Sequence, residues 1–290
     1  MEVHNNILSH FGIVIMSNNV LYEAFKSKLN IENPIIKVET VSNYVSDILD
    51  RITKALEDEE IFQPQSELYN WIIELANLLN DEKDDVYDRI GWLALLAYDL
   101  ECVKSKSSES FLKVKNDLKK QAHDRRFFDF VAELNTISSL LRDGFNATLR
   151  ESPDVEIMYE NEKLFMEVTQ RSLAKGKRVQ NLNKIKNAAL KKSEKGYANG
   201  KTALAIHATD IVKSASDYND FEDLFRDLKD DGAINFGAVI IFFKLAIENE
   251  RDSAYDYKAF FRHVILNQCD VKLKDLIHSK YSYFGTDIPR

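Results

Sequence analysis

Two uninterrupted apolar runs in the second half of the chain constrain its fold most. Thr202 to Thr209 reads TALAIHAT and Phe236 to Leu245 reads FGAVIIFFKL, and neither run alternates polar with apolar residues. A strand that packs on one face shows that alternation, whereas a strand of this composition is expected to be covered on both faces. The two runs therefore predict a sheet with helices on both sides.

The segments around these runs predict the other elements of an α/β domain. A helical stripe of apolar residues ends before Gly144, which is a typical helix stop. Short stretches rich in β-formers follow, and a lysine-rich helix separates them from TALAIHAT. We expect helices at Arg125–Arg142, Arg178–Tyr197, Phe221–Leu228 and Tyr257–Leu266, and strands at Asn146–Leu149, Val155–Tyr159 and Leu164–Thr169.

The first 120 residues show helical spacing instead. Apolar residues at intervals of three and four form stripes that begin at Val45, Leu68 and Val86. The polar, serine-rich segment from Lys104 to Glu109 is the best linker candidate. The expected fold class is α/β (α+β), with a helical N-terminal region over residues 1–120 and a mixed sheet flanked by helices over residues 121–290.

Composition narrows the cellular setting. The apolar run near the start, Phe11 to Met16, is far too short to cross a bilayer, and no basic segment precedes it. Cys102 and Cys269 are isolated, without metal-ligand spacing or a disulfide framework. We expect a cytoplasmic protein with no membrane partner.

Charge is distributed unevenly along the chain. Residues 46–101 carry fifteen Asp/Glu and four Lys/Arg, whereas residues 171–201 carry ten Lys/Arg and one Glu, although the whole chain has a net charge of −8. A local excess of cations is typical of a face that binds a polyanion, and it is also compatible with a solvated helix. The residues of this window expected to bind nucleic acid are Lys177, Arg178, Lys184, Lys186, Lys191 and Lys192.

The hairpin before this basic window holds acidic residues in unusual positions. Asp154 opens the first strand, and Glu167 lies among apolar residues of the second, with Thr169 two positions further on. If the turn spans residues 160–163, Tyr159 pairs with Leu164, and Asp154, Glu167 and Thr169 share one face. Two carboxylates about 4 Å apart repel by about 4 kcal/mol at an effective dielectric of ~20. A divalent cation, Mg²⁺ or Mn²⁺, would hold them together.

These residues resemble the motifs of the PD-(D/E)XK, or restriction-endonuclease-like, nuclease superfamily. The helix supplies Glu133 within ELNTISSLLRDG, Pro153-Asp154 opens a strand, and Glu167-Val168-Thr169 stands where the family has Glu-x-Lys. The order of the elements is similar over residues 125–245. The resemblance implies metal-dependent hydrolysis of phosphodiester bonds in nucleic acid, with DNA the expected substrate.

The resemblance also implies roles for single residues. Asp154, Glu167 and the carbonyl of Val168 would hold the metal, and Glu133 would contact the metal or its waters. Thr169 replaces the lysine that helps to activate water and neutralise charge, and its hydroxyl carries no charge. Either a lysine reaches in from the next helix, with Lys184 and Lys186 as candidates, or a second metal substitutes, or the site is inactive.

Two other interpretations stay open. In the first, the nuclease fold is catalytically inactive and binds nucleic acid or a protein partner. In the second, the domain is unrelated and its acids are structural, with Glu167 in a salt bridge to a helix lysine. The acidic N-terminal helices would repel nucleic acid, so we expect them to contact a protein partner or a second copy of the chain.

Overall fold

A computed structural model describes residues 38–57, 62–80, 86–171, 178–214, 218–249 and 254–281. The predicted fold class is confirmed, because a six-stranded mixed sheet flanked by helices follows a helical N-terminal part. The chain forms two compact units. The first comprises residues 1–131 and 246–257, and the second comprises residues 132–245 and 258–290.

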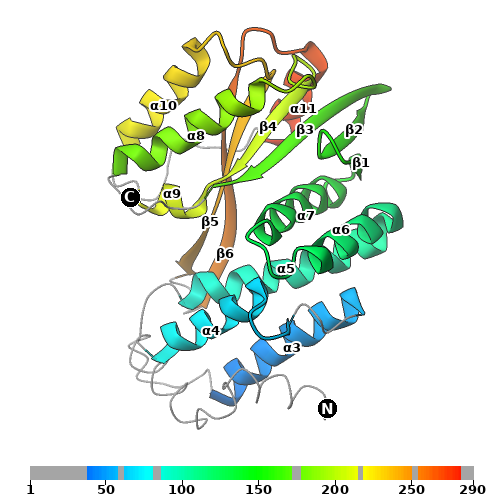
Figure 1. Ribbon diagram of the computed structural model, residues 1–290, viewed down its shortest axis with the longest axis vertical. Coiled ribbons are helices and arrows are strands. Elements are labelled where there is room, and N and C mark those ends of the chain that lie inside the picture. Colours follow the sequence, from blue (N-terminus) through cyan, green and yellow to red (C-terminus); the bar gives the residue numbers. More distant parts are fainter. Residues whose placement is uncertain are drawn as a thin grey trace. The chain divides into compact units, whose positions relative to one another are not determined.

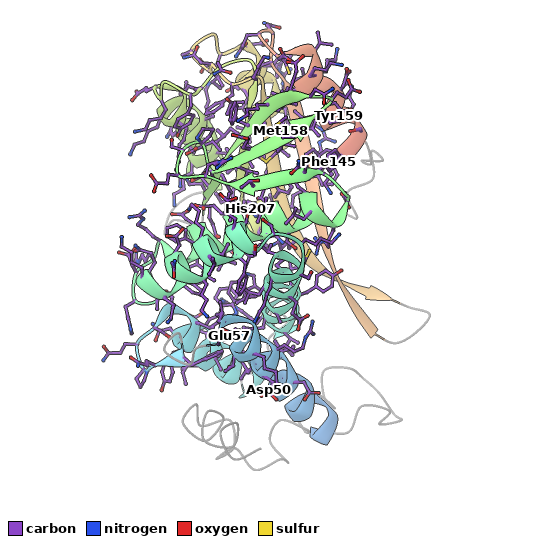
Figure 2. All side chains as sticks on the ribbon, turned by 90° about the vertical axis from the view of Figure 1, so that its right-hand side faces the viewer. Asp50, Glu57, Phe145, Met158, Tyr159 and His207 are labelled. Atoms are coloured by element: carbon purple, nitrogen blue, oxygen red, sulfur yellow. The ribbon has the colours of Figure 1, made fainter. Side chains whose placement is uncertain are left out.

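The described part of the first unit is mainly helical. Its helices are α3 (Val38–Leu56), α4 (Glu67–Asn80), α5 (Val86–Lys106), α6 (Ser108–Lys120) and the start of α7 (Phe127–Arg142). The predicted stripe of α3 is buried from Val45 to Leu56, which explains why this segment forms an amphipathic helix. Glu57, labelled in Figure 2, lies directly after α3. It accepts hydrogen bonds from Lys104 of α5 and Lys115 of α6.

The predicted linker at Lys104–Glu109 is wrong. Helix α5 continues through Lys106, and α6 begins at Ser108. Ser107 caps α6, and its side chain accepts a hydrogen bond from the Ser110 amide. Serine is favoured at a helix N-cap because its oxygen satisfies an amide that lacks an intrahelical partner. The serine-rich composition therefore marks a tight junction between two helices.

The sheet has the strand order β1-β2-β3-β4-β5-β6. Its strands are β1 (Asn146–Leu149), β2 (Val155–Tyr159), β3 (Glu162–Gln170), β4 (Thr202–His207), β5 (Ala238–Asn249) and β6 (Ala254–Ile265). The β1–β2 and β2–β3 pairs are antiparallel, whereas the β3–β4 and β4–β5 pairs are parallel. The parallel β3–β4 connection runs through α8 (Arg178–Ser193), as a crossover requires.

Helices cover both faces of the central strands, as the two apolar runs predict. Leu204 and Ile206 of β4 join a core with α8 residues and with α10 (Tyr218–Asp230). On the other face, Thr136 of α7 contacts His207, and α11 (Val271–Lys280) is tied to α7 because Lys280 donates to the Ser139 carbonyl. Figure 1 shows α8 and α10 on one side of the strands and α7 on the other. We call these the α8 face and the α7 face.

Gly144 ends α7 as predicted. Its φ of +83° is left-handed, and the Phe145 amide donates to the Leu140 carbonyl at 3.0 Å. This is the pattern of a helix that closes with a glycine in the left-handed region. The chain then enters β1 directly, which places β1, β2 and β3 beside α7.

The hairpin turn differs from the prediction. Tyr159 pairs with Glu162, so the turn contains only Glu160 and Asn161, and their φ angles are +47° and +66°. Two left-handed residues suit a two-residue hairpin, because the twist of that turn matches the twist of the strands. The register is thus shifted by two residues. An even shift keeps every side chain on its predicted face.

The C-terminal elements also differ. The helix predicted at Tyr257–Leu266 is wrong, because this segment forms most of β6, and the helix is α11 at Val271–Lys280. Aromatic and β-branched residues favour a strand when a neighbouring edge offers hydrogen bonds, and β5 offers that edge. Helix α8 ends at Ser193, four residues earlier than predicted, so Tyr197 lies in the loop before β4.

Candidate functional site

The site is built on the middle of β3. Glu167 pairs with Leu204 and Thr169 pairs with Ile206, so both side chains lie on the α8 face. Both are buried, with exposed fractions of 3% for Glu167 and 4% for Thr169. A buried carboxylate needs a partner, since leaving the charge alone in the interior is strongly unfavourable.

The partner of Glu167 is Lys192, on the last turn of α8. The Lys192 ammonium donates to Glu167 Oε1 and forms a salt bridge with it. The Glu167 side chain is 5% exposed and that of Lys192 is 27% exposed, so the pair is open to solvent from the lysine side. The sequence names Lys184 and Lys186 as candidates for a cation at this place, and Lys192 fills it.

Asp154 stands beside Glu167 on the neighbouring strand. The register pairs Val155 with Met166, and one further step along both strands places Asp154 opposite Glu167. Residues opposite each other on antiparallel strands have Cβ atoms about 4.5–5.5 Å apart. Asp154 is half-buried, and its Oδ2 accepts a hydrogen bond from the Val168 amide at 2.7 Å.

The backbone of Val168 faces Asp154. The amides of Phe165 and Arg171 donate to carbonyls of the β4 side, so the odd-numbered residues of β3 hydrogen-bond toward β4. Backbone groups alternate along a strand, and the amide and carbonyl of Val168 therefore point toward β2. Because β2 begins only at Val155, the Val168 carbonyl lies at the same side as the Asp154 carboxylate.

Tyr197 places a hydroxyl beside Glu167. Burial raises its pKa, and so do a hydrogen bond to Glu167 and the negative charges of Glu167 and Asp154, while a hydrogen bond to Ser152 acts in the opposite direction. The strand register sets Asp154 opposite Glu167, and the Tyr197 hydroxyl is hydrogen-bonded to Glu167. The cluster therefore consists of Asp154, Glu167, Lys192 and Tyr197, with Thr169 next along the strand.

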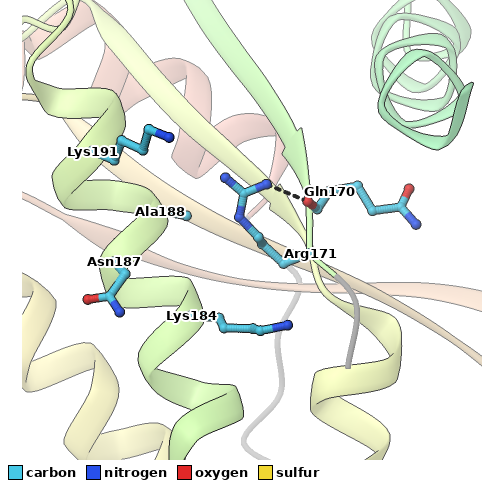
Figure 3. A pocket seen from close by; sticks show the side chains of 6 residues that line it. All are labelled: Gln170, Arg171, Lys184, Asn187, Ala188 and Lys191. Carbon is cyan, nitrogen blue, oxygen red and sulfur yellow. Dashed lines mark hydrogen bonds between the residues drawn. The ribbon is translucent and has the colours of Figure 1, made fainter. Parts of the chain in front are cut away.

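The other predicted cations of α8 fall into two groups. Lys184 and Lys191 line a pocket of about 350 Å³ beside the end of β3 (Figure 3). Lys186 faces away and pairs with Asp227 at 3.3 Å and Asp231 at 3.6 Å. Lys177 and the side chain of Arg178 lie outside the described residues.

Glu133 is not brought into the cluster. It lies one turn before Thr136 on α7, and the Thr136 hydroxyl meets His207 Nε2 at 3.0 Å on the α7 face. Asp154 and Glu167 occupy the α8 face of the same sheet. In the described part of the chain, no three His, Cys, Asp or Glu side chains form a group that could hold a metal ion. A metal here would therefore rely on two carboxylates.

The sequence gives only weak signals for two residues at the site that its motifs do not predict, Tyr197 and Arg171. Tyr197 belongs to the segment KGYANGK, where an aromatic residue between glycines stands out, but nothing in the spacing links it to Glu167. Arg171 follows Glu167 and Thr169 at intervals of two, so its position on the α8 face follows from strand alternation.

Comparison of the chain with protein-family models, curated proteins and solved structures finds no match. Within the described residues, no helix combines the length and the apolar character that crossing a membrane needs.

Proposed function

We propose that the protein hydrolyses phosphodiester bonds in nucleic acid, with DNA the expected substrate, using a divalent metal held by Asp154 and Glu167. The observation that carries this proposal is the meeting of two carboxylates from adjacent strands, with a lysine ammonium against one of them. Groups of opposite charge in this arrangement suit a phosphate and the cation that accompanies it.

The donor atoms fit Mg²⁺ or Mn²⁺. Asp154 and Glu167 offer carboxylate oxygens, and the Val168 carbonyl points toward the same side, so all three ligands are hard oxygens. Mg²⁺ commonly binds one or two carboxylates and completes its shell with water and substrate phosphate, which accords with a two-carboxylate site. The bound metal would lower the pKa of a water molecule and stabilise negative charge on phosphate.

Lys192 would supply the cation that Thr169 cannot. Its ammonium already touches Glu167, so it lies where it can neutralise charge on a phosphate and orient water. The Thr169 hydroxyl and the Tyr197 hydroxyl would position that water by hydrogen bonds. Because Lys192 comes from α8 rather than β3, the lysine of the Glu-x-Lys pattern would have moved to the helix.

The arrangement of the elements also supports the resemblance to the PD-(D/E)XK superfamily. The chain runs from helix α7 through the antiparallel strands β1, β2 and β3, crosses over in α8 and returns as β4 parallel to β3. This is the order of elements on which the resemblance rests. Glu133 fits less well, since it lies on the opposite face, and we leave it out of the proposed mechanism.

The second candidate function is binding of nucleic acid without hydrolysis. The Glu167–Lys192 salt bridge favours a site without a metal, because the ammonium occupies an oxygen that a metal would otherwise use, and it is also the pair expected of a structural Glu167. The two functions share a substrate and differ in whether a divalent metal displaces or accompanies Lys192.

The test is cleavage of plasmid and linear DNA by the full chain in Mg²⁺ or Mn²⁺, with EDTA as the blank. Asp154→Asn and Glu167→Gln should each lower the rate by about 10²–10³-fold, as loss of a charge-stabilising group does. Lys192→Met should lower it by a similar factor.

Glu156→Gln is the matched control. Glu156 lies on the same face of the hairpin, but it pairs with Lys163 at 3.1 Å and Arg150 at 3.5 Å. The Glu156→Gln variant should cleave DNA at the same rate as the unchanged protein. Cleavage that survives both Asp154→Asn and Glu167→Gln would reject the assigned site, and DNA binding without cleavage in either metal would favour the second function.

A further inference from the structure

A basic pocket opens beside the end of β3, next to the proposed site. Its volume is about 350 Å³, and it is lined by Gln170, Arg171, Lys184, Asn187, Ala188 and Lys191 (Figure 3). None of these six described residues is acidic, and three are cations. This volume lies near the lower end of the ~300–1,000 Å³ typical of small-molecule sites.

Two elements bring the cations together. On α8, Lys184, Asn187 and Lys191 follow at intervals of three and four, so they share one side of the helix. Directly after β3, the Arg171 amide still donates to the His207 carbonyl of β4, so Arg171 continues the alternation of Glu167 and Thr169 and points toward α8. Figure 3 shows the side chains of Arg171, Lys184 and Lys191 entering the space between the strand end and the helix.

The Arg171 side chain is oriented by its own strand. Its Nη1 donates to the Gln170 carbonyl at 2.7 Å. A guanidinium has five N–H donors in a planar fork, so this bond orients the group and uses only part of its donor capacity. Planar donors of this kind match the oxygens of a phosphate.

The lysines of α8 differ in what they face. Lys186 is directed to Asp227 and Asp231 of α10, and Lys192 is directed to Glu167. Lys184 and Lys191 instead line the pocket with Arg171. Cationic side chains that line one hollow suit an anionic ligand.

The pocket and the carboxylates lie along one strand. Arg171 is four residues beyond Glu167, which corresponds to about 13 Å of extended chain. Nucleic acid that places one phosphate near Asp154 and Glu167 would thus carry another phosphate toward the pocket.

We propose that this pocket binds a backbone phosphate of nucleic acid, further along the strand than the phosphate at Asp154 and Glu167. The proposal rests on the proposed function for its choice of ligand. It assigns Arg171, Lys184 and Lys191 as phosphate-binding residues and excludes Lys186.

The experiment measures binding of a labelled DNA duplex to the full chain in EDTA over a range of salt concentrations. Lys184→Gln and Lys191→Gln should each weaken binding several-fold and reduce the slope of log affinity against log salt by about 0.9, the value for one phosphate contact on duplex DNA. Lys201→Gln is the matched control, because Lys201 is on the hairpin side and pairs with Glu162 at 2.7 Å. It should leave the slope unchanged.

An equal loss of slope in all three variants would contradict phosphate binding in the pocket. It would indicate only nonspecific electrostatic attraction between the protein and DNA. Inorganic phosphate provides the second arm, measured by its effect on thermal unfolding. The nucleic-acid assignment is wrong if phosphate raises the unfolding temperature only when Lys184 and Lys191 are present and the affinity for DNA is the same in both lysine variants. The pocket would then bind free phosphate.

The two proposals fail separately. Binding in EDTA needs no hydrolysis, so a slope change without cleavage keeps the pocket and rejects the nuclease. Cleavage with unchanged slopes in Lys184→Gln and Lys191→Gln keeps the nuclease and rejects the pocket.

Discussion

The two faces of β3 and β4 hold their buried polar groups in opposite ways. On the α7 face, His207 is buried, stacks on Phe242 with ring centroids 4.9 Å apart, and meets the Thr136 hydroxyl at 3.0 Å. Burial, followed by the charge of Lys244, lowers the pKa of His207 well below its usual value, so the imidazole is neutral. On the α8 face, Glu167 is kept in an ion pair with a partly exposed lysine.

This difference shows how one sheet separates structure from chemistry. On the α7 face, the neutral imidazole of His207 has a hydroxyl as its hydrogen-bond partner and an aromatic ring stacked on it, which stabilises packing and excludes water. The other face keeps charges next to solvent, where they can interact with an ionic ligand. Neighbouring residues such as Glu167 and Val168 belong to different environments because strand side chains alternate.

Breaking the ion pair should have the largest effect on stability. Lys192→Met leaves Glu167 buried without its cation and should reduce the free energy of unfolding by about 3 kcal/mol, near the lower end for broken buried pairs. Urea unfolding in EDTA measures it. Millimolar Mg²⁺ should recover part of the loss if the carboxylates bind metal.

The control for this change is Lys201→Met, which breaks the Lys201–Glu162 pair, whose side chains are 47% and 40% exposed. Exposed pairs contribute at most about 1 kcal/mol. Equal losses in the two variants would mean that Glu167 is not a buried charge that depends on Lys192.

Removing the Thr136 hydroxyl, which accepts the hydrogen bond of His207 on the α7 face, should have the next largest effect on the free energy of unfolding. The Thr136 hydroxyl donates to the Ala132 carbonyl at 2.9 Å, so it can only accept from His207 Nε2–H. Thr136→Val leaves that N–H unpaired and should cost about 2 kcal/mol in unfolding free energy. Thr148→Val on the half-exposed β1 position should be close to neutral, and a matching loss there would contradict the interpretation.

Acid should destabilise the folded protein through His207 on the α7 face. The unfolded chain takes up a proton on this residue below about pH 6.5, and the folded state does not, because its pKa is lowered. Stability from the neutral imidazole is therefore present above that pH and is lost as pH falls, with a slope approaching about 1.4 kcal/mol per pH unit. His207→Gln keeps a donor for Thr136 and should flatten the dependence between pH 6.5 and 5. Unfolding curves at several pH values measure the slope of the unfolding free energy against pH. The same slope in His207→Gln and in the unchanged protein would contradict the role of His207.

Tyr197→Phe should have the smallest effect. It removes one hydrogen bond to Glu167, with an expected loss of about 1 kcal/mol in unfolding free energy. In the unchanged protein, the phenol should ionise at a higher pH than an exposed tyrosine, and its absorbance on titration reports this. An ordinary tyrosine titration for Tyr197 would mean that its hydroxyl is not buried beside Glu167.

Much of the second unit could be predicted from local sequence. The strands at Asn146–Leu149 and Val155–Tyr159, the helix stop at Gly144 and the doubly covered strands follow from turn residues, periodicity and apolar runs. The hairpin register was predicted with an error of two residues, since the turn could hold two or four residues. The faces were still predicted correctly because the error was even.

The partners of the acids could not be predicted in the same way. Lys184, Lys186, Lys191 and Lys192 are similar residues on one helix, and only the position and rotation of α8 on the sheet decide that Lys192 reaches Glu167 while Lys186 reaches α10. The same holds for β6, whose aromatic segment is a strand because β5 presents an edge beside it.

The sequence by itself therefore determined which residues share a face, because alternation along a strand and spacing along a helix are local geometry. Tertiary structure alone decided which faces meet, since that depends on how helices pack across the sheet. It joined Asp154 and Glu167 with Lys192 and Tyr197, and it placed helix α7, which carries Glu133, on the other side of the sheet from α8 (Figure 1).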